Sequence, residues 1–178
     1  MPTNTEIKAH DRDPARTRTL AEGLATEPPA TLVQHDTFFA TARARLKLRE
    51  FPDASPSRPA ELILYDRPDT EGPGASHYAI TETRDPDGLR AILAAALGEA
   101  GEVRKRRTVI MAGRTRIHLD EVVGLGHFVE LEVVLAHGED PTRGEAEARR
   151  LMAALAIDPD DLVAGAYLDL LRAADSAG

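Results

Sequence analysis

Four segments of the chain alternate polar and apolar residues with a period of two, as a β-strand with one apolar and one polar face does. These segments are residues 4–10, 45–49, 116–120 and 128–133. Apolar stretches predict further strands around Leu32–Phe39, Glu61–Arg67, Ser76–Thr81 and Val103–Met111. The sequence Gly124-Leu125-Gly126 is typical of a turn that joins two strands as a hairpin. The pattern therefore predicts about eight strands.

Asp-Pro pairs mark the beginnings of the predicted helices. An Asp side chain accepts hydrogen bonds from the exposed amides of a first turn, and Pro has no N–H to lose there. The pairs lie at 13–14, 85–86, 140–141 and 158–159, and apolar residues recur at helical spacing after each of them. The first helix covers about Pro14–Leu24. The clearest apolar face consists of Leu89, Ile92, Leu93, Ala96 and Leu97, and it ends near Gly98 or Gly101.

Together these elements predict an α+β protein, with helices packed on the apolar face of a mainly antiparallel sheet. An eight-stranded antiparallel sheet of this length tends to close into a barrel, and closure turns the charged face inward. Two interpretations of that face stay open: a solvated surface, or the lining of a cavity. The charges favour the cavity because they are sorted by strand, with Glu130 and Glu132 on one strand and Arg45, Lys47 and Arg49 on another.

Carboxylates suit Mg²⁺ or Mn²⁺, whereas guanidinium and ammonium groups suit phosphate oxygens. A cavity lined by both kinds of group would bind a polyphosphate together with its metal ion. The side chains of Glu130 and Glu132 are about 6–7 Å apart along their strand, a spacing at which carboxylates repel unless a cation bridges them.

Composition narrows the alternatives. The 178 residues are 42% hydrophobic and 29% charged, which fits one globular domain over residues 1–178. The absence of cysteine excludes a disulfide framework, a thiolate nucleophile and a zinc site built on sulfur. A net charge of −8 and the lack of tryptophan argue against general nucleic-acid binding. No apolar run approaches the roughly 20 residues of a membrane helix, so we expect a cytoplasmic protein.

Seven segments, taken in order, resemble the strands of the CYTH superfamily, the class IV adenylyl cyclase and thiamine triphosphatase group. Near the N-terminus the matches are NTEIKA at 4–9 (family ExExK), QHDTFF at 34–39 (QxDTYF) and RLKLRE at 45–50 (GRLKLRE). The later matches are ELILYDRPD at 61–69, VRKRR at 103–107, RIHLDEVVGLG at 116–126 and FVELEV at 128–133 (FxExE). The ordered set covers nearly the whole chain and is far more specific than any single motif.

The resemblance implies a closed tunnel of eight antiparallel strands that binds a triphosphate together with Mg²⁺ or Mn²⁺. It implies metal ligands at Glu6, Asp120, Glu130 and Glu132, with Asn4 where the family has another Glu. The implied phosphate-binding residues are Lys8, Arg45, Lys47, Arg49, Arg67, Lys105, Arg107 and Arg116. The expected ligands are ATP or another nucleotide, thiamine triphosphate or tripolyphosphate. A homodimer is compatible with the sequence.

Two departures from the family pattern bear on activity. Asn4 offers a carbonyl oxygen but no charge, so a metal at this position is expected to bind more weakly. Phe38 replaces the tyrosine that the family uses to assist the attacking water. The candidate catalytic residues are therefore Lys8, Tyr65 and His118. We expect either triphosphate hydrolysis or cyclisation of ATP; the alternative is a diverged protein that binds nucleotide or polyphosphate without catalysis.

Overall fold

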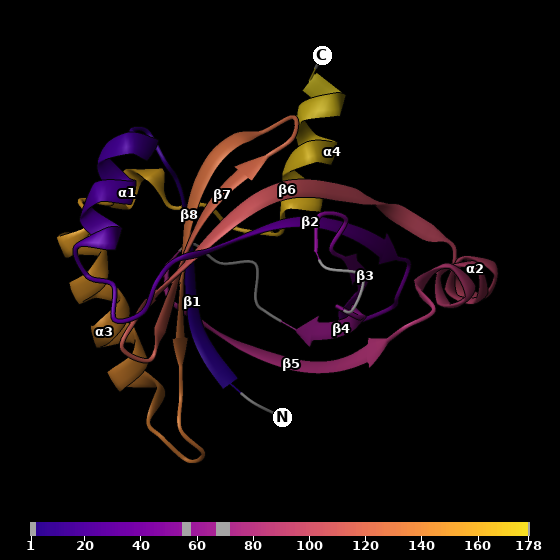
Figure 1. Cartoon of the computed structure of the whole chain (residues 1–178), viewed down its shortest axis with the longest axis horizontal. Helices are drawn as coiled ribbons and strands as arrows, with labels where there is room; N and C mark the ends of the chain where they lie inside the picture. The colour runs from indigo at the N-terminus through magenta and orange to yellow at the C-terminus, as the bar shows by residue number, and fades with distance from the viewer. Residues whose placement is uncertain (1–2, 55–57, 67–71, 178) are drawn as a thin grey trace.

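Eight antiparallel strands close into a barrel, as the sequence predicts (Figure 1). The structure, a computed structural model, describes residues 3–54, 58–66 and 72–177. The strand order around the barrel is β1-β5-β4-β3-β2-β6-β7-β8. The strands are β1 (Thr3–His10), β2 (Ala30–Phe39), β3 (Arg45–Glu50), β4 (Ala60–Asp66), β5 (Gly74–Thr83), β6 (Glu99–Ala112), β7 (Thr115–Val122) and β8 (Gly126–Val134).

The strand register determines which side chains meet inside the barrel. Between β1 and β8, Glu6 lies opposite Glu132 and Lys8 lies opposite Glu130. Between β7 and β8, His118 lies opposite the same Glu130. Because successive side chains point to opposite faces of a strand, the charged residues share the lumen and the apolar residues between them face outward.

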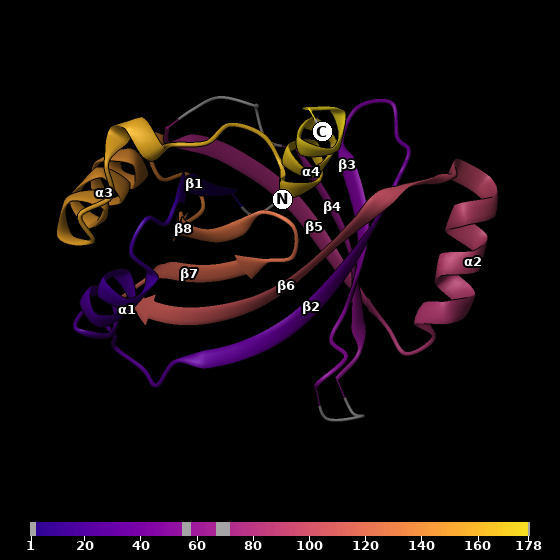
Figure 2. The same ribbon diagram turned by 90° about the horizontal axis from the view of Figure 1, so that it is seen from above.

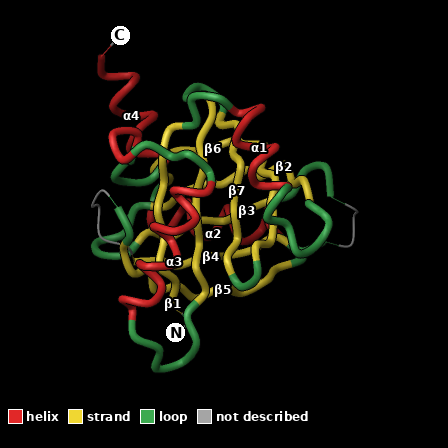
Figure 3. The backbone as a smooth tube through the Cα atoms, turned by 90° about the vertical axis from the view of Figure 1, so that its left-hand side faces the viewer, coloured by secondary structure: helices red, strands yellow, loops and turns green. Residues whose placement is uncertain are grey.

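The largest group of buried apolar side chains packs on the outer face of the sheet, while a second group, which includes Phe38, Val103 and Tyr167, lines part of the lumen. Helices α1 (Pro14–Glu22) and α3 (Pro141–Ala154) pack beside each other on one side of the barrel, and α2 (Pro86–Leu97) lies on the opposite side (Figures 1, 2 and 3). Ile7, Ile117 and Leu131 are completely buried beneath α1 and α3, together with Leu151 of α3. No helix in the described ranges is long and apolar enough to cross a membrane.

The first three Asp-Pro pairs begin helices as predicted. The side chains of Asp13, Asp85 and Asp140 each accept a hydrogen bond from a backbone N–H of the following first turn. The apolar face predicted for α2 is only partly correct. Leu89 and Leu93 pack toward Leu48 of the barrel, whereas Ile92 is 66% exposed. The physical reason is that α2 packs against β2 and β3 through the side that carries Leu89 and Leu93, so the rest of its apolar surface faces solvent.

The prediction of a helix directly after Asp158-Pro159 is wrong. Only one 3₁₀ turn forms there, over Pro159–Asp161, and the last helix, α4 (Tyr167–Ala177), begins six residues later. Between them the chain is extended against the barrel, because the Val163 N–H donates to the Lys8 carbonyl oxygen at 2.9 Å and Leu162 bridges Ala9. The backbone groups of Leu162 and Val163 therefore form hydrogen bonds with β1 and are not available for the hydrogen bonds of a helix.

Gly144 marks a close approach between α3 and the barrel. A Cβ atom added at this residue would overlap Thr5 Oγ1 and come within 2.7 Å of Leu135 Cδ2. We expect Gly144→Ala to lower the free energy of unfolding by about 1–3 kcal/mol through overpacking, although alanine is normally the better helix former. Urea denaturation measures the change, with the exposed neighbour Arg143→Ala as control. A stabilised Gly144→Ala variant would contradict this close packing.

Candidate active site

The barrel encloses a cavity of about 510 Å³ that side chains from all eight strands line. Among the described residues, eight that line the cavity are basic, namely Lys8, Arg45, Lys47, Arg49, Arg58, Lys105, Arg107 and Arg116. Five lining residues in the same described part of the chain are acidic, namely Glu6, Asp36, Glu61, Glu130 and Glu132. The lumen therefore has an excess of positive charge although the whole chain has a net charge of −8. Such a cavity attracts anions.

Arg107 is the centre of the most buried cluster. Its guanidinium donates two hydrogen bonds to Asp120, one of them at 2.7 Å from Nε to Oδ1, and a further one to Glu130 Oε2. Lys105 Nζ lies 3.4 Å from Asp120 Oδ2. Burial alone would raise the pKa of Asp120, but the charges of Arg107 and Lys105 outweigh burial and lower this pKa to about 2. Asp120 is therefore ionised at neutral pH and anchors Arg107.

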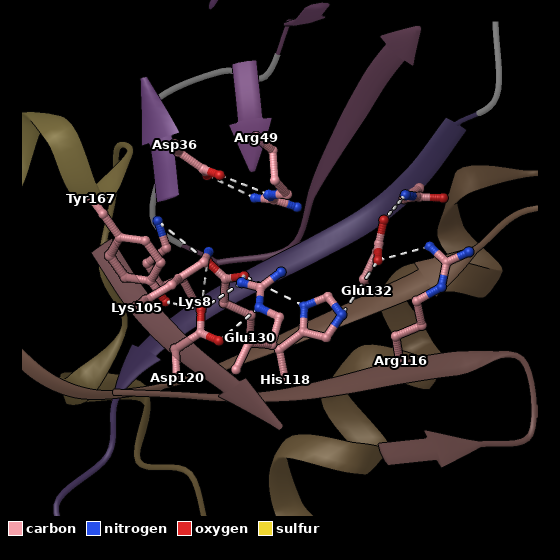
Figure 4. A network of polar contacts seen from close by, with 12 residues as sticks. Lys8, Asp36, Arg49, Lys105, Arg116, His118, Asp120, Glu130, Glu132 and Tyr167 are labelled. Atoms are coloured by element: carbon pink, nitrogen blue, oxygen red, sulfur yellow. Dashed lines mark hydrogen bonds and ion pairs between the residues drawn. The ribbon is translucent and has the colours of Figure 1, made fainter. Parts of the chain in front are cut away.

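A second cluster surrounds Asp36 of β2. Its carboxylate accepts a hydrogen bond from Lys47 Nζ and two from Arg49, each at 2.7 Å (Figure 4 shows the Arg49 contacts). Burial opposes the charged form of Asp36, but the two bases outweigh it and lower the pKa of the carboxyl group well below 3.8. Burial and the neighbouring Arg49 lower the pKa of Lys47 to about 8. Asp36 therefore fixes two of the cationic side chains that line the lumen.

His118 lies between two carboxylates (Figure 4). Its Nδ1 is 3.6 Å from Glu130 Oε2, and its Nε2 is 3.8 Å from Glu132 Oε2. Burial, followed by the charge of Arg107, lowers the pKa of His118, so its imidazole is neutral at neutral pH. Glu132 also accepts hydrogen bonds from Asn4 Nδ2 and, at 2.9 Å, from Arg116 Nη1. This group forms the carboxylate-rich part of the lumen.

The first turn of α4 completes the lumen, and the sequence pattern does not predict this. The Tyr167 hydroxyl donates to Asp120 Oδ2 at 3.0 Å, and Lys8 Nζ lies 4.1 Å from the centre of the Tyr167 ring. Asp169 forms a 2.8 Å ion pair with Arg45. No strand periodicity marks these residues, because they reach the lumen from outside the sheet.

The predicted site residues on the described strands gather in one place. The three candidate catalytic residues and the described phosphate-binding candidates line the cavity, as do Glu6, Glu130 and Glu132. Asp120 lies behind Arg107, and Asn4 is fully buried beside Glu132. Arg67 lies outside the described residues. Tyr65 faces Lys47, whose Nζ is 5.4 Å from its ring centre, and burial raises the pKa of the Tyr65 hydroxyl.

Residues 2–167 match the family model of the CYTH domain. The chain therefore belongs to the CYTH domain family, as its motifs indicate. A search of curated proteins found no match.

Solved structures share the fold at low sequence identity. The PH1012 protein of Pyrococcus horikoshii is 20% identical with a TM-score of 0.82, and the match covers 94% of this chain and 99% of that one. A candidate adenylate cyclase from Vibrio parahaemolyticus is 19% identical with a TM-score of 0.76, and the match covers 95% of this chain and 97% of that one. A candidate adenylyl cyclase from Hippeastrum, which has a dominant triphosphatase activity, is 16% identical with a TM-score of 0.66. The match covers 97% of this chain and 96% of that one.

We expect Asp36→Asn to destabilise the fold by about 3 kcal/mol, because it leaves Lys47 and Arg49 with uncompensated buried charge. The pKa of Asp36 is lower in the folded protein, so its contribution is complete above pH 3.8 and is lost as the pH falls below that value. Urea denaturation from pH 7 to pH 3 measures both effects. Glu121→Gln, on the exposed side of β7, is the control. Equal stability of the two variants at pH 7 would contradict this role for Asp36.

Proposed function

We propose that this protein is an enzyme that acts on the triphosphate group of a small molecule bound in the barrel lumen. The observation that carries the proposal is the concentration of eight basic side chains around one cavity of about 510 Å³. Membership of the CYTH family supports it, because similar folds include a protein with triphosphatase activity. The negative charge of a triphosphate would balance the excess of basic over acidic side chains in this lining.

The basic residues are positioned before any ligand arrives. Asp36 fixes Lys47 and Arg49, and Asp120 fixes Arg107, so these cations lose little further conformational entropy when a phosphate binds. Phosphoryl-transfer reactions are accelerated mainly by positioning and by stabilisation of the charge that develops on the transferred and leaving groups. A lumen with fixed guanidinium and ammonium groups provides both.

Glu6, Glu132 and Asn4 are the residues that fit a divalent cation best. Glu6 and Glu132 are directly opposite on neighbouring strands, which places their Cβ atoms roughly 4.5–5.5 Å apart. Asn4 Oδ1 is buried and accepts no hydrogen bond from the part of the chain that is described. Among the described residues, no three His, Asp or Glu side chains are arranged to hold a metal. The amide oxygen of Asn4 would therefore be the third protein ligand, beside the carboxylates of Glu6 and Glu132. Mg²⁺ or Mn²⁺ bound there would neutralise phosphate charge.

His118 is the best candidate to accept a proton from the attacking hydroxyl group. It lines the cavity, its imidazole is neutral, and two carboxylates beside it stabilise the imidazolium that proton transfer would create. Tyr65 stays protonated because its pKa is raised, so it acts as a hydrogen-bond donor. Attack by water would give hydrolysis. Attack by the ribose 3′-hydroxyl of ATP would give cyclic AMP and release pyrophosphate.

The proposal is tested by turnover of ATP, GTP, thiamine triphosphate and tripolyphosphate with Mg²⁺ and with Mn²⁺, followed by identification of the products. We expect His118→Asn to lower kcat by about 10²-fold, because general base catalysis contributes at least this much. The matched control is His127→Asn, which changes an exposed histidine of β8. Unchanged turnover in His118→Asn would exclude His118 as the proton acceptor.

Asn4 and Phe38 favour a second candidate function, which is binding of a nucleotide or polyphosphate without catalysis. Asn4 removes a negative charge from the expected metal site, and Phe38 removes a hydroxyl group from the lumen. Calorimetric binding measured on the same four ligands distinguishes the two functions. Tight binding without any product would favour the second.

The metal assignment predicts that Mn²⁺ raises the melting temperature of the wild-type protein by binding to the folded state. The double variant Glu6→Gln/Glu132→Gln should lose this rise, because it removes both charged ligands. Glu61→Gln, a lumen carboxylate on β4, should keep it. Thermal melts over a range of Mn²⁺ concentrations give the comparison. A rise of wild-type size in the double variant would mean that the cation binds elsewhere.

A further inference from the structure

The chain before α4 closes over one end of the lumen. Val163 is fixed to β1 by its hydrogen bond to Lys8, and the Lys8 side chain donates to the Gly165 carbonyl oxygen at 2.8 Å. Gly165, Ala166 and Tyr167 all line the cavity. Gly165 has a φ of 82°, a left-handed conformation that lets the chain turn from the extended segment into the helix. The first turn of α4 is therefore part of the cavity wall.

Asp169 places a carboxylate of that first turn on a lumen cation. Its Oδ2 accepts from Arg45 Nη2 at 2.8 Å and from the Ala166 N–H at 3.0 Å. Arg45 lines the cavity, whereas Asp169 is 43% exposed and lies at its rim. A residue proposed to bind phosphate thus interacts with an anion that belongs to the protein itself.

A carboxylate and a phosphate group recognise a guanidinium through the same N–H groups. A ligand phosphate that reaches Arg45 must therefore displace Asp169 or share Arg45 with it. Loss of an ion pair as exposed as that between Arg45 and Asp169 changes a binding constant by only about threefold to fivefold. The attraction between Arg45 and a multiply charged phosphate is strong enough to replace the ion pair with Asp169. The buried hydrogen bond between Tyr167 and Asp120 keeps α4 attached when that ion pair is lost.

We propose that Asp169 competes with the phosphate groups of the ligand for Arg45, and so lowers the affinity of the lumen for anions while it holds α4 in place. This inference rests on the proposed function, because it requires a phosphate ligand in the lumen. Displacement of Asp169 also frees the Ala166 N–H from its side-chain acceptor. Ligand binding should therefore loosen the first turn of α4.

Calorimetric titration with tripolyphosphate tests the competition. Asp169→Asn should bind tripolyphosphate about threefold to fivefold more tightly than the wild type. The matched control is Asp175→Asn, which makes the same charge change at an exposed position six residues further along α4 and should leave affinity unchanged. In an Arg45→Gln background, Asp169→Asn should have no effect, because the group for which Asp169 competes is gone. Hydrogen exchange should show faster exchange of the α4 first turn when tripolyphosphate binds the wild type.

The outcomes separate this inference from the proposed function. If the wild type binds tripolyphosphate and Asp169→Asn binds it no better than Asp175→Asn does, competition is excluded and the proposed function stands. If Asp169→Asn still tightens binding without Arg45, the effect is general charge repulsion and the inference is overturned. If neither the wild type nor any variant binds tripolyphosphate, ATP, GTP or thiamine triphosphate, both the proposed function and the competition are wrong.

Discussion

The buried contacts of Arg107 are the interaction on which the lumen depends. One guanidinium joins Asp120 of β7 to Glu130 of β8, and Asp120 in turn accepts the Tyr167 hydroxyl from α4. Removing one member of such a group leaves uncompensated charge in a poorly hydrated space, which is far more costly than losing an exposed ion pair. Arg107 of β6 thus ties β7 and β8 together directly and α4 through Asp120, while it also faces the cavity.

Paired acids and bases explain how a cavity with so much positive charge is compatible with a folded barrel. Asp36 and Asp120 are ionised anchors that offset part of the repulsion between lysines and arginines. The basic residues nevertheless outnumber the acids in the lining, and this surplus is available to an anionic ligand. The same contacts that stabilise the empty barrel therefore position its cations for phosphate.

Much of this arrangement is predictable from local sequence, and the rest depends on long-range register. The period-two pattern places Glu130 and Glu132 on one face, and the ordered motifs predict a closed barrel around them. The pattern does not reveal that Asp120 binds Arg107, since that contact depends on how β6 and β7 pair. The strand pattern does not indicate Tyr167 and Asp169, because a helix outside the sheet brings them to the lumen. The error after Asp158-Pro159 has a similar origin, because pairing with β1 overrides a local helix signal.

The helices back the barrel wall unevenly, and this has a consequence for its dynamics. β1, β7 and β8 are sealed beneath α1 and α3 by completely buried side chains, whereas Leu64 of β4 is 41% exposed and Ala79 of β5 faces solvent. Cooperative units with few buried apolar contacts open at lower free energy than the rest of a protein. We therefore expect the wall formed by β4 and β5 to be the more flexible side of the barrel. We expect motion of this side to change the width of the lumen while β1 and β8, which carry Glu6, Glu130 and Glu132, stay in place.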